Sequence, residues 1–374
     1  MRVVHVVPSV DPAAGGPARS VPELCVALAA EGLEVVLVTL GSARPLEGVE
    51  VLALPPVRGT RQAPTYRAIR SLREVVMTPD LLHVHSLWNL PVAVVIKSAL
   101  AANVPYVITP RGMLQEVALG RHAIRKRAVY RLAVRSALEH ACAIHFLSRA
   151  EEADSHRLVP NGVPTVMIPN GIDPDLGRGL EPGRFRDRHN LTGKRLVLFV
   201  GRLHWSKNLE LQLAAIRELV VHIPDIVWVL IGPDEGQWES LRSAIDAADL
   251  AANVRWLGAM DRAEVLDAFA DADVVLLTSR HEAHPMSMNE ALVIGAPLVM
   301  THQTGFPHLD GRGAAVVDAS AASVAAAVRA ILDDPGTAEA MRVAGRLTAR
   351  AEYGWGRVAG QIIAAYEAHC LSRG

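Results

Sequence analysis

The sequence predicts an α/β protein made of two doubly wound domains facing each other. Short runs of β-branched and other apolar residues, each with the length of a buried strand, alternate with segments of helical spacing. At 374 residues the chain exceeds the size at which one hydrophobic core stops growing. A polar stretch with several Pro, Gly and Arg residues, 173–192, separates two such series and indicates a linker.

The first series opens with a parallel βαβ unit. We expect a strand at 3–7, a glycine loop, a helix from Ser20 towards Gly32, and a strand at 34–39. The loop pair Gly15-Gly16 matches neither a dinucleotide fingerprint nor a phosphate-binding loop with its lysine. It indicates either a backbone segment that approaches a ligand closely or a tight turn. Further strands are expected at 49–53, 81–85, 106–109, 143–147 and 166–168.

Two loops of this series follow buried strands and are expected to face a cleft. They are residues 85–88 and the segment Pro110-Arg111-Gly112. Ligands of doubly wound sheets bind beyond the carboxyl ends of the strands. Because His83 and His85 alternate on one strand, we expect only one of them to point to a given face. Either is a packed histidine or a catalytic group.

The second series contains the strands and helices of the other domain. Its strands are expected at 196–200, 226–231, 254–257, 274–277, 297–300 and 314–317, with helical segments between them. Three helices are expected near the end of the chain, at 323–332, 338–351 and 355–370.

The first strand of this series is followed by two cations, Arg202 and Lys207, before a helix that starts near Leu209. Cations beside backbone N–H groups stabilise a diphosphate, above all while it leaves and gains charge. The alternative is that Lys207 is simply exposed.

The stretch from Ser279 to Pro297 carries two carboxylates. The strand at 274–277 delivers Glu282 to a loop, and the helix that follows carries Glu290 before it ends at Gly295. A helix N-terminus beside a loop carboxylate suits a ligand that is anionic at one end and rich in hydroxyls at the other. The simpler alternative is a cap and a solvated glutamate.

The composition limits the class of partner and the compartment. Lys+Arg 38 against Asp+Glu 39 gives a formal net charge of -1, which argues against a nucleic-acid partner. Cys25, Cys142 and Cys370 have no metal-like spacing and are expected to be buried free thiols in a reducing compartment. The N-terminus resembles a strand rather than a signal peptide, and no apolar run is long enough to span a bilayer. We therefore expect a cytoplasmic protein.

Residues 121–135 form a basic segment with no acidic residue. On a helix, Arg127, Arg131 and Arg135 make one stripe. This pattern is consistent with peripheral contact to an anionic membrane surface, with binding of a phosphorylated acceptor, or with a solvated helix face.

Taken together, these motifs resemble those of retaining glycosyltransferases of the GT-B fold, close to glycosyltransferase family four. The resemblance spans nearly the whole chain. It rests on the Gly15-Gly16 loop with Arg19, residues 169–173, Gly201 to Leu203 with Lys207, the segment from Glu282 to Pro297, and the terminal helix at Trp355. It implies a Rossmann-like acceptor domain at 1–175, a linker at 176–192, a Rossmann-like donor domain at 193–350, and a helix at 351–374 that crosses back to the first domain.

The resemblance also implies an activity: transfer of a sugar from a UDP- or GDP-sugar to a hydroxyl of a glycan, lipid-linked or small-molecule acceptor, with retention and without a metal. Arg202 and Lys207 would hold the diphosphate, Glu290 the ribose, and Glu282 the transferred sugar. The remaining donor contacts would come from Gly15, Gly16, Gly258, Met260, His284, Met286 and Ser287. No protein nucleophile is implied, because the departing phosphate takes the acceptor's proton.

The chain departs from the family pattern at three positions. Arg111 stands where a histidine is frequent; it cannot act as a base at neutral pH and would bind an anionic group of the donor or acceptor. His284 replaces an aromatic residue, and Asn208 replaces a glycine.

Two other functions remain open, and a third is disfavoured. A metal-dependent GT-A enzyme would use Asp271 and Asp273, but both precede a strand, and a helix-end cap accounts for Asp271. The others are a nucleotide-sugar epimerase of GT-B fold and a non-catalytic nucleotide-sugar binding subunit.

Overall fold

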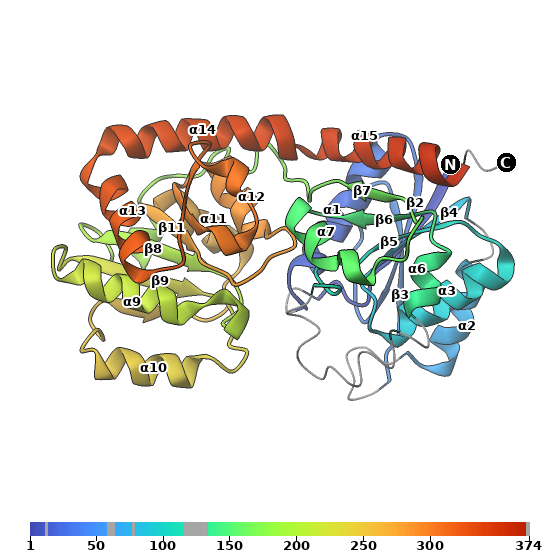
Figure 1. Cartoon of the computed structure of the whole chain (residues 1–374), viewed down its shortest axis with the longest axis horizontal. Coiled ribbons are helices and arrows are strands. Elements are labelled where there is room, and N and C mark those ends of the chain that lie inside the picture. The colour runs from blue at the N-terminus through green and yellow to red at the C-terminus, as the bar shows by residue number, and fades with distance from the viewer. Residues whose placement is uncertain (12–13, 58–63, 77–78, 116–129, 131–133, 372–374) are drawn as a thin grey trace. The chain divides into compact units, whose positions relative to one another are not determined.

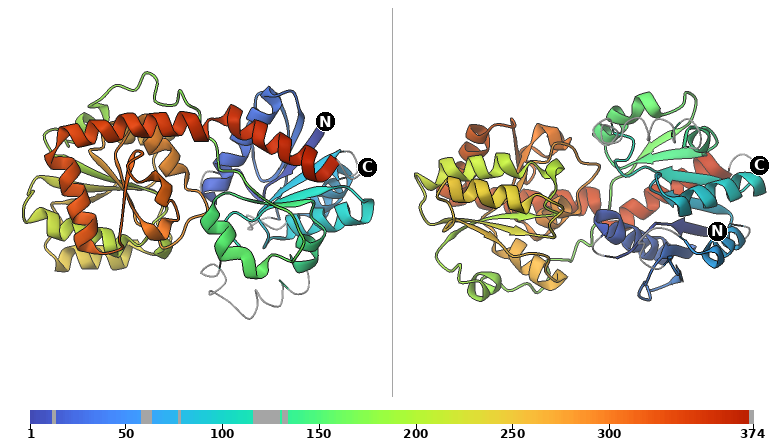
Figure 2. Two further views of the ribbon diagram at one scale, coloured as in Figure 1. Left: turned by 45° about the horizontal axis from the view of Figure 1, so that its top comes forward. Right: turned by 90° about the horizontal axis from the view of Figure 1, so that it is seen from below.

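The computed structural model describes residues 1–11, 14–57, 64–76, 79–115, 130 and 134–371. The chain forms two compact units (Figure 1). Unit 1 contains Met1–Gly171 and Trp355–Gly374, and unit 2 contains Ile172–Gly354. Each unit is a parallel sheet with helices on both faces (Figure 2), as the alternation of strand and helix patterns predicts.

Unit 1 has a seven-stranded sheet of order β3-β2-β1-β4-β5-β6-β7. Its strands are β1 Arg2–Val6, β2 Glu34–Leu40, β3 Val49–Leu54, β4 Leu81–His85, β5 Tyr106–Thr109, β6 Ala143–Phe146 and β7 Thr165–Met167. Its helices are α1 Gly16–Ala30, α2 Tyr66–Val75, α3 Leu90–Ala102, α6 Arg135–Glu139, α7 Arg149–Ser155 and α15 Trp355–Tyr366. The strand order reverses at β1 and β4, which pair with each other in parallel.

Unit 2 has a six-stranded sheet of order β10-β9-β8-β11-β12-β13. Its strands are β8 Arg195–Val200, β9 Ile226–Ile231, β10 Val254–Trp256, β11 Val274–Leu277, β12 Leu298–Thr301 and β13 Ala314–Val317. Its helices are α8 Arg184–Arg188, α9 Leu209–Val220, α10 Trp238–Ala247, α11 Arg262–Asp271, α12 Met286–Ile294, α13 Ala321–Asp333 and α14 Pro335–Tyr353. Here the order reverses at β8 and β11.

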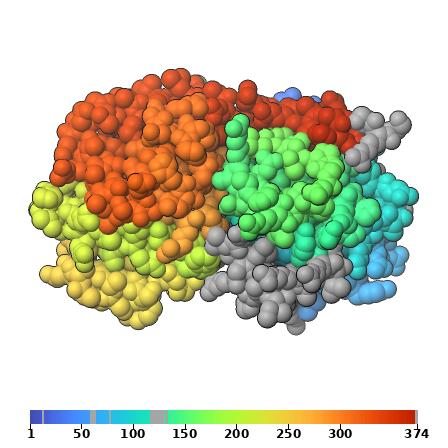
Figure 3. Space-filling model, in the orientation of Figure 1, coloured from blue at the N-terminus to red at the C-terminus, as the bar shows by residue number. Residues whose placement is uncertain are grey.

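The inner strands of both sheets are buried on their two faces, whereas the edge strands β3, β7 and β13 are partly exposed. In unit 1, alternate strand residues such as Val3 and Val107 pack with α1 and α15, while Val4 and Ile108 pack with α2 and α3. In unit 2, α9 and α13 cover one face, and α11, α12 and α14 the other. Figure 3 shows α13 and α14 on the visible surface of this unit. Burial on both faces explains why the strands are continuous apolar runs.

The polar segment 176–192 is part of unit 2, so the prediction of a linker there is wrong. The segment forms α8, whose Phe185 is fully buried. The carboxylate of Asp271 accepts hydrogen bonds from the backbone N–H groups of Phe185 and Arg186 at 2.8 and 3.0 Å. These contacts join residues about 85 positions apart, and a local composition signal cannot reveal them.

The chain passes between the units twice, from Gly171 to Ile172 and from Gly354 to Trp355. The N–H of Ile172 donates to the carbonyl of Tyr353 at 2.6 Å, and Ile172 forms a parallel bridge with Gly354. A Cβ on Gly171 would lie 2.2 Å from the ring of Trp355. The terminal helix joins unit 1, as predicted, but it begins at Trp355 and not at residue 351.

Candidate functional site

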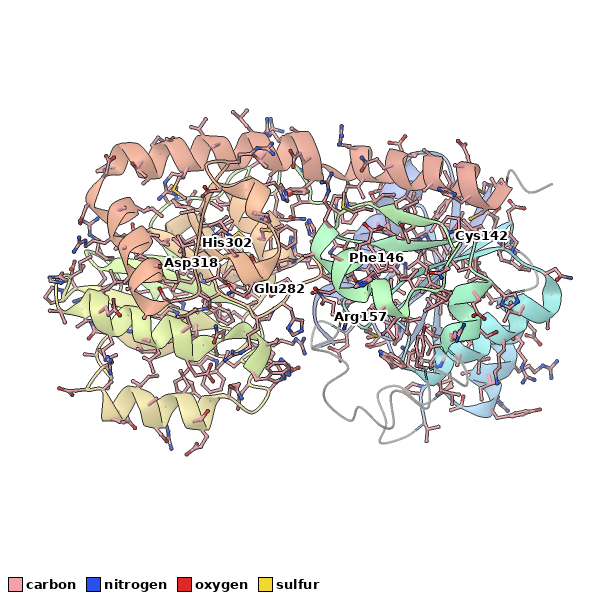
Figure 4. The ribbon with its side chains drawn as sticks, in the orientation of Figure 1. Cys142, Phe146, Arg157, Glu282, His302 and Asp318 are labelled. Carbon is pink, nitrogen blue, oxygen red and sulfur yellow. The ribbon has the colours of Figure 1, made fainter. Side chains whose placement is uncertain are left out.

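The first part of the site lies where the strand order of unit 2 reverses. Lys207 ends a 3₁₀ turn, Trp205–Lys207, which follows β8, and Glu282 lies in the loop after β11 (Figure 4). Lys207 Nζ is 2.5 Å from Glu282 Oε1, and the side chains are only 16% and 11% exposed. Crevices at such reversal points are where doubly wound sheets bind ligands. The structure thus brings these two predicted residues into one ion pair.

Hydrogen bonds between the two loops hold this pair in place. Arg280 N–H donates to the carbonyl of Ser206 at 2.8 Å, and the Thr278 hydroxyl donates to the carbonyl of Lys207 at 3.3 Å. Asn208 adopts a left-handed conformation with φ 55° and ψ 47°. Glycine is favoured at such a position and asparagine tolerates it, so Asn208 fits this turn before α9.

The second part is the start of α12. Its N-cap, Pro285, provides no side-chain cap, so the first-turn N–H groups include amides without an intrahelical partner. Glu290 lies in the second turn and its side chain is only 3% exposed. Arg262 Nη1 is 2.7 Å from Glu290 Oε1. Sequence reasoning missed Arg262, because it begins another helix, α11, 28 positions earlier.

Arg202 forms an ion pair with Glu235. Its Nη1 donates to both carboxylate oxygens of Glu235 at 2.7 and 2.6 Å. The loops after β8 and β9 approach closely here, since a Cβ on Gly232 would lie 2.0 Å from the carbonyl oxygen of Gly201. Arg202 therefore follows β8 as predicted, and its role at a diphosphate stays a prediction.

The other predicted donor residues of unit 2 lie in the loop after β10 and at the start of α12. Gly258 has a positive φ of 73°, and its carbonyl accepts from Gly232 N–H at 2.7 Å. Met260 packs against the core, Met286 is buried, and Ser287 is partly exposed. The buried ring of His284 lies edge-on to Phe306 and Tyr353, with centroids 5.2 Å from each. His284 therefore packs in an aromatic environment.

In unit 1 the glycine loop begins α1. Gly15 is the N-cap with φ 88°, a conformation that favours glycine. A Cβ on Gly16 would meet no atom within 4 Å among the described residues. The helix starts four residues before the predicted Ser20, because Pro17 occupies its first turn, where proline is tolerated. Contact of Gly15 and Gly16 with a ligand stays a prediction.

Arg111 lies just beyond β5, in a left-handed conformation with φ 55°. Its Nε donates to His85 Nδ1 at 3.3 Å, and its Nη1 donates to Ser20 Oγ and Asn170 Oδ1 at 3.0 and 3.2 Å. Burial lowers the pKa of Arg111 to about 10, although the charge of Glu151 opposes this shift. The guanidinium therefore remains a cation at neutral pH.

Four buried histidines form a cluster of neighbouring rings, and Arg111 contacts this cluster through His85. His83 and His85 point to the same face of the sheet, with ring centroids 4.3 Å apart, so the prediction that only one faces a given side is wrong. Residues two apart on a strand share a face. His5 on β1 and His145 on β6 join them, with centroids 4.9 and 5.6 Å from His83. Burial lowers the pKa of His5 to about 3 and that of His145 to about 4.

Nitrogen atoms of His5, His83 and His85 lie within 4.8 Å of one another, a spacing that a metal ion would allow. His5 Nδ1 and His85 Nε2 already share a hydrogen bond of 3.0 Å. His83 Nδ1 and Nε2 lie 2.6 and 2.7 Å from Tyr366 Oη and Thr109 Oγ1. A metal ion would have to replace these bonds, and we infer no metal site here.

Glu151 is a further residue that sequence reasoning missed. Its buried carboxylate accepts from the N–H groups of Gly112 and, at 2.8 Å, Leu147, so it joins the loops after β5 and β6. Burial raises the pKa of Glu151 to about 6. Ser148 and Glu151 have the spacing of a capping box, and Ser148 Oγ accepts from Glu151 N–H at 3.1 Å. That spacing was a usable signal for a helix start, although not for the contact with Gly112.

The aspartates considered for a GT-A metal site serve the structure of unit 2. Asp271 binds the start of α8, and Asp273 pairs with Arg186 at 2.9 Å and accepts from Leu196 N–H at 2.6 Å. Both precede β11, at the end of the strand opposite to the loop of Glu282. The structural role accounts for both carboxylates.

Most of the basic segment 121–135 lies outside the described residues. Arg135 is exposed and pairs with Glu139 at 2.8 Å. Contact of the segment with a membrane or acceptor stays a prediction. No described helix is long and apolar enough to cross a membrane. Cys25, Cys142 and Cys370 are buried thiols that take part in no disulfide within the described residues, as predicted.

Comparison with known proteins identifies the family. The family model "Glycosyl transferase 4-like domain" matches residues 15–171, and "Glycosyl transferases group 1" matches residues 183–348. Glycogen synthase of Mycobacterium tuberculosis is 30% identical over 197 residues, which are 52% of this chain and 46% of that relative. The alignment thus spans about half the length of this curated relative.

Solved structures share the fold over nearly the whole chain. Sucrose-phosphate synthase from Thermosynechococcus elongatus has a TM-score of 0.78 at 22% identity, covering 98% of both chains. Anabaena HepE in complex with UDP and glucose has a TM-score of 0.81 at 16% identity, covering 98% of this chain and 100% of that one. The two doubly wound units therefore form a GT-B fold. Within that class, the chain belongs to the group 1 glycosyltransferases of the family four type.

Proposed function

We propose that the protein transfers a sugar from a UDP- or GDP-sugar to a hydroxyl of a glycan, lipid-linked or small-molecule acceptor, with retention of configuration and without a metal ion. The observation that carries this proposal is the Lys207–Glu282 pair at the reversal point of β8 and β11. A cation, a carboxylate and the amides that start α12 suit a ligand with phosphate at one end and hydroxyls at the other.

Each group has a part in the proposed reaction. Lys207 stabilises the diphosphate as it leaves, and Arg202 joins it by exchanging Glu235 for phosphate. Glu290 accepts from the ribose hydroxyls, and Glu282 accepts from the hydroxyls of the transferred sugar. The acceptor oxygen attacks from the face that the diphosphate leaves, and a phosphate oxygen takes its proton. The complex of Anabaena HepE with UDP and glucose supports a nucleotide-sugar donor.

Thermal unfolding in the presence of nucleotide sugars tests the proposal. We would compare UDP-, GDP-, ADP- and dTDP-sugars without metal, with Glu290→Ala as the control. A ligand stabilises in proportion to the logarithm of its concentration over its dissociation constant. Selective stabilisation that the variant loses supports the donor site, and no response with or without manganese contradicts it.

Product analysis then separates the proposed transferase from the two GT-B alternatives. A glycosylated acceptor supports transfer and eliminates the binding subunit. Conversion of the donor sugar without any acceptor identifies an epimerase instead.

A further inference from the structure

Arg111 differs from the other predicted cations in its partners. Lys207 pairs with Glu282, and Arg202 with Glu235. Within the part of the chain that the structure describes, Arg111 has no carboxylate at ion-pair distance, and its three hydrogen-bond acceptors are the neutral groups of His85, Ser20 and Asn170. Its Nη2 has no hydrogen-bond partner among the described residues, and the side chain is partly exposed. Nη2 therefore keeps two N–H groups that can donate charge-assisted hydrogen bonds to an oxygen of a carboxylate or phosphate.

The hydrogen bond from Arg111 fixes the protonation of two histidines. A guanidinium only donates, so His85 Nδ1 carries no proton and His85 Nε2 does. His85 Nε2 then donates to His5 Nδ1 at 3.0 Å. His5 therefore carries its proton on Nε2, a fully buried atom without a hydrogen-bond partner in the described chain.

A second chain fixes the remaining two histidines without Arg111. The carbonyl of Ile168 only accepts, so His145 Nε2 donates to it at 2.7 Å and His145 Nδ1 accepts from the Thr109 hydroxyl at 2.9 Å. That hydroxyl has one proton, and it therefore accepts from His83 Nε2 at 2.7 Å. His83 Nδ1 accepts from Tyr366 Oη at 2.6 Å. His83 and His85 are thus equally buried on one strand, yet only His85 contacts Arg111.

The backbone around Arg111 is also constrained. Ser86, which directly follows β4, and Arg111, two residues after the end of β5, both have positive φ values, 79° and 55°. Non-glycine residues in this region cost energy and cluster at functional sites. The buried Glu151 carboxylate holds the N–H of Gly112, the residue after Arg111. These contacts fix the guanidinium at the edge of the sheet where β1 and β4 reverse the strand order.

We propose that Arg111 is a binding residue for an oxyanion, the phosphate or carboxylate of a substrate, and that His85, backed by His5, is its positioning residue. The identity of the substrate rests on the proposed function, whereas the existence of the anion site does not. The neutral His85 ring is an acceptor that does not neutralise the cation, so the charge remains available to the ligand. Burial, which lowers the pKa of Arg111, is consistent with a cation that gains from an anionic partner.

Ring ¹⁵N resonances of histidine-labelled protein test the anion site directly. We would titrate inorganic phosphate into the full chain and into Lys207→Ala, which removes the cation of the donor site. The His85 signal is identified by its loss in His85→Asn. We expect it to shift to saturation in both proteins and to stay unchanged in Arg111→Gln. No shift, or the same shift in Arg111→Gln, overturns the proposal whether or not a nucleotide binds.

The same signal identifies the source of the oxyanion. A response to UDP assigns the site to the donor's diphosphate, and a response to glucuronate assigns it to a carboxylated substrate. A response to phosphate alone identifies an adventitious ion only and overturns the role in substrate binding.

A double-mutant cycle tests the positioning role of His85. We expect His85→Leu to lower kcat/KM at least about tenfold, and His85→Asn to retain most of it because the amide oxygen replaces the Nδ1 acceptor. In the Arg111→Gln background, His85→Leu should have no further effect. His83→Leu is the matched control and should act independently of Arg111. Multiplicative effects of His85→Leu and Arg111→Gln overturn the positioning role.

Discussion

Lys207 Nζ and Glu282 Oε1 lie 2.5 Å apart, although 75 positions separate the two residues in the chain. The pair joins the loops of the two strands at which the sheet of unit 2 reverses its order. Both side chains are mostly buried, so solvent screens their interaction only weakly. When a ligand binds here, its own charged groups and hydroxyls replace the contact between Lys207 and Glu282.

Replacing Lys207 should impair the reaction more than binding. We expect Lys207→Ala to lower turnover by roughly a hundredfold or more, the scale for loss of one preorganised group that stabilises developing charge. Steady-state kinetics with the donor found in the nucleotide panel measures this effect. Turnover within a fewfold of the parent would contradict the role at the diphosphate.

Two controls separate catalysis from folding in this experiment. Lys194→Ala removes an exposed lysine just before β8 and should leave turnover unchanged. Removing one partner of a mostly buried pair leaves an uncompensated charge. Lys207→Met combined with Glu282→Gln removes both charges, so it should be more stable to urea than Lys207→Ala while remaining inactive.

Replacing Glu290 should weaken nucleotide binding. We expect Glu290→Gln to lower affinity for the selected nucleotide diphosphate about tenfold to a hundredfold, because hydrogen bonds to a charged acceptor contribute about 1.5–3 kcal/mol. Titration calorimetry provides the measurement. The control is Glu239→Gln, an 82% exposed glutamate in an ion pair with Arg242. Equal affinities for the parent and Glu290→Gln would exclude the ribose role.

Glycines at two positions should respond oppositely to a methyl group. Gly171→Ala places a Cβ 2.2 Å from the Trp355 ring, and we expect a loss of about 1–3 kcal/mol in the free energy of unfolding. Gly360→Ala, on the same helix as Trp355, meets no atom within 4 Å among the described residues and should stabilise by about 0.5–1 kcal/mol. Urea denaturation measures both.

Trp355→Leu provides the matched background for this comparison. A smaller side chain leaves room for the methyl group, so Gly171→Ala should cost less there than in the parent. Equal costs in both backgrounds would show that the contact between Gly171 and Trp355 does not determine the requirement for glycine.

Local patterns predicted most strands because their signal is contained in consecutive residues. The bounds of β4, β5, β9, β11 and β13 agree with the predicted ranges. The sequence also placed Lys207 and Glu282 at one edge of the sheet, because each follows the carboxyl end of a parallel strand of the same domain.

The residues that prediction missed act through contacts between distant segments. Arg262 reaches Glu290 from another helix, and Glu151 reaches Gly112 across 39 positions. The linker prediction failed for the same reason, because Asp271 binds the start of α8 from a later helix. Sequence spacing defines the element on which such a side chain lies, while the partner depends on the packing of the two elements.

The four buried histidines should make the protein sensitive to acid. The pKa of His5 is lowered to about 3 and that of His145 to about 4, and burial lowers the pKa values of His83 and His85 well below 6.5. In the unfolded chain all four bind protons near pH 6.5, whereas the folded protein binds them only at lower pH. Their stabilising contribution is therefore present above pH 6.5 and is lost as pH falls.

Glu151 opposes this effect over a narrow range. Its pKa is about 6 in the folded protein against 4.5, so the folded state takes up this proton first and gains stability as pH falls from 6 to 4.5. The folded state gains from one proton on Glu151, whereas the unfolded state gains from four protons on the histidines. The free energy of unfolding therefore falls overall as the pH falls. Each uncompensated proton changes stability by about 1.4 kcal/mol per pH unit. The direction is therefore a loss of stability as the pH falls below 6.

Urea denaturation at a series of pH values measures this slope. We expect the free energy of unfolding to fall steeply below pH 6, and His145→Gln to reduce the slope by about one proton while retaining a donor for the carbonyl of Ile168. His222→Gln, at an exposed histidine, should leave the slope unchanged. A free energy of unfolding that stays constant down to pH 4.5 would mean that the histidines are protonated in the folded protein, and the assigned hydrogen-bond chains, which require neutral rings, would then be wrong.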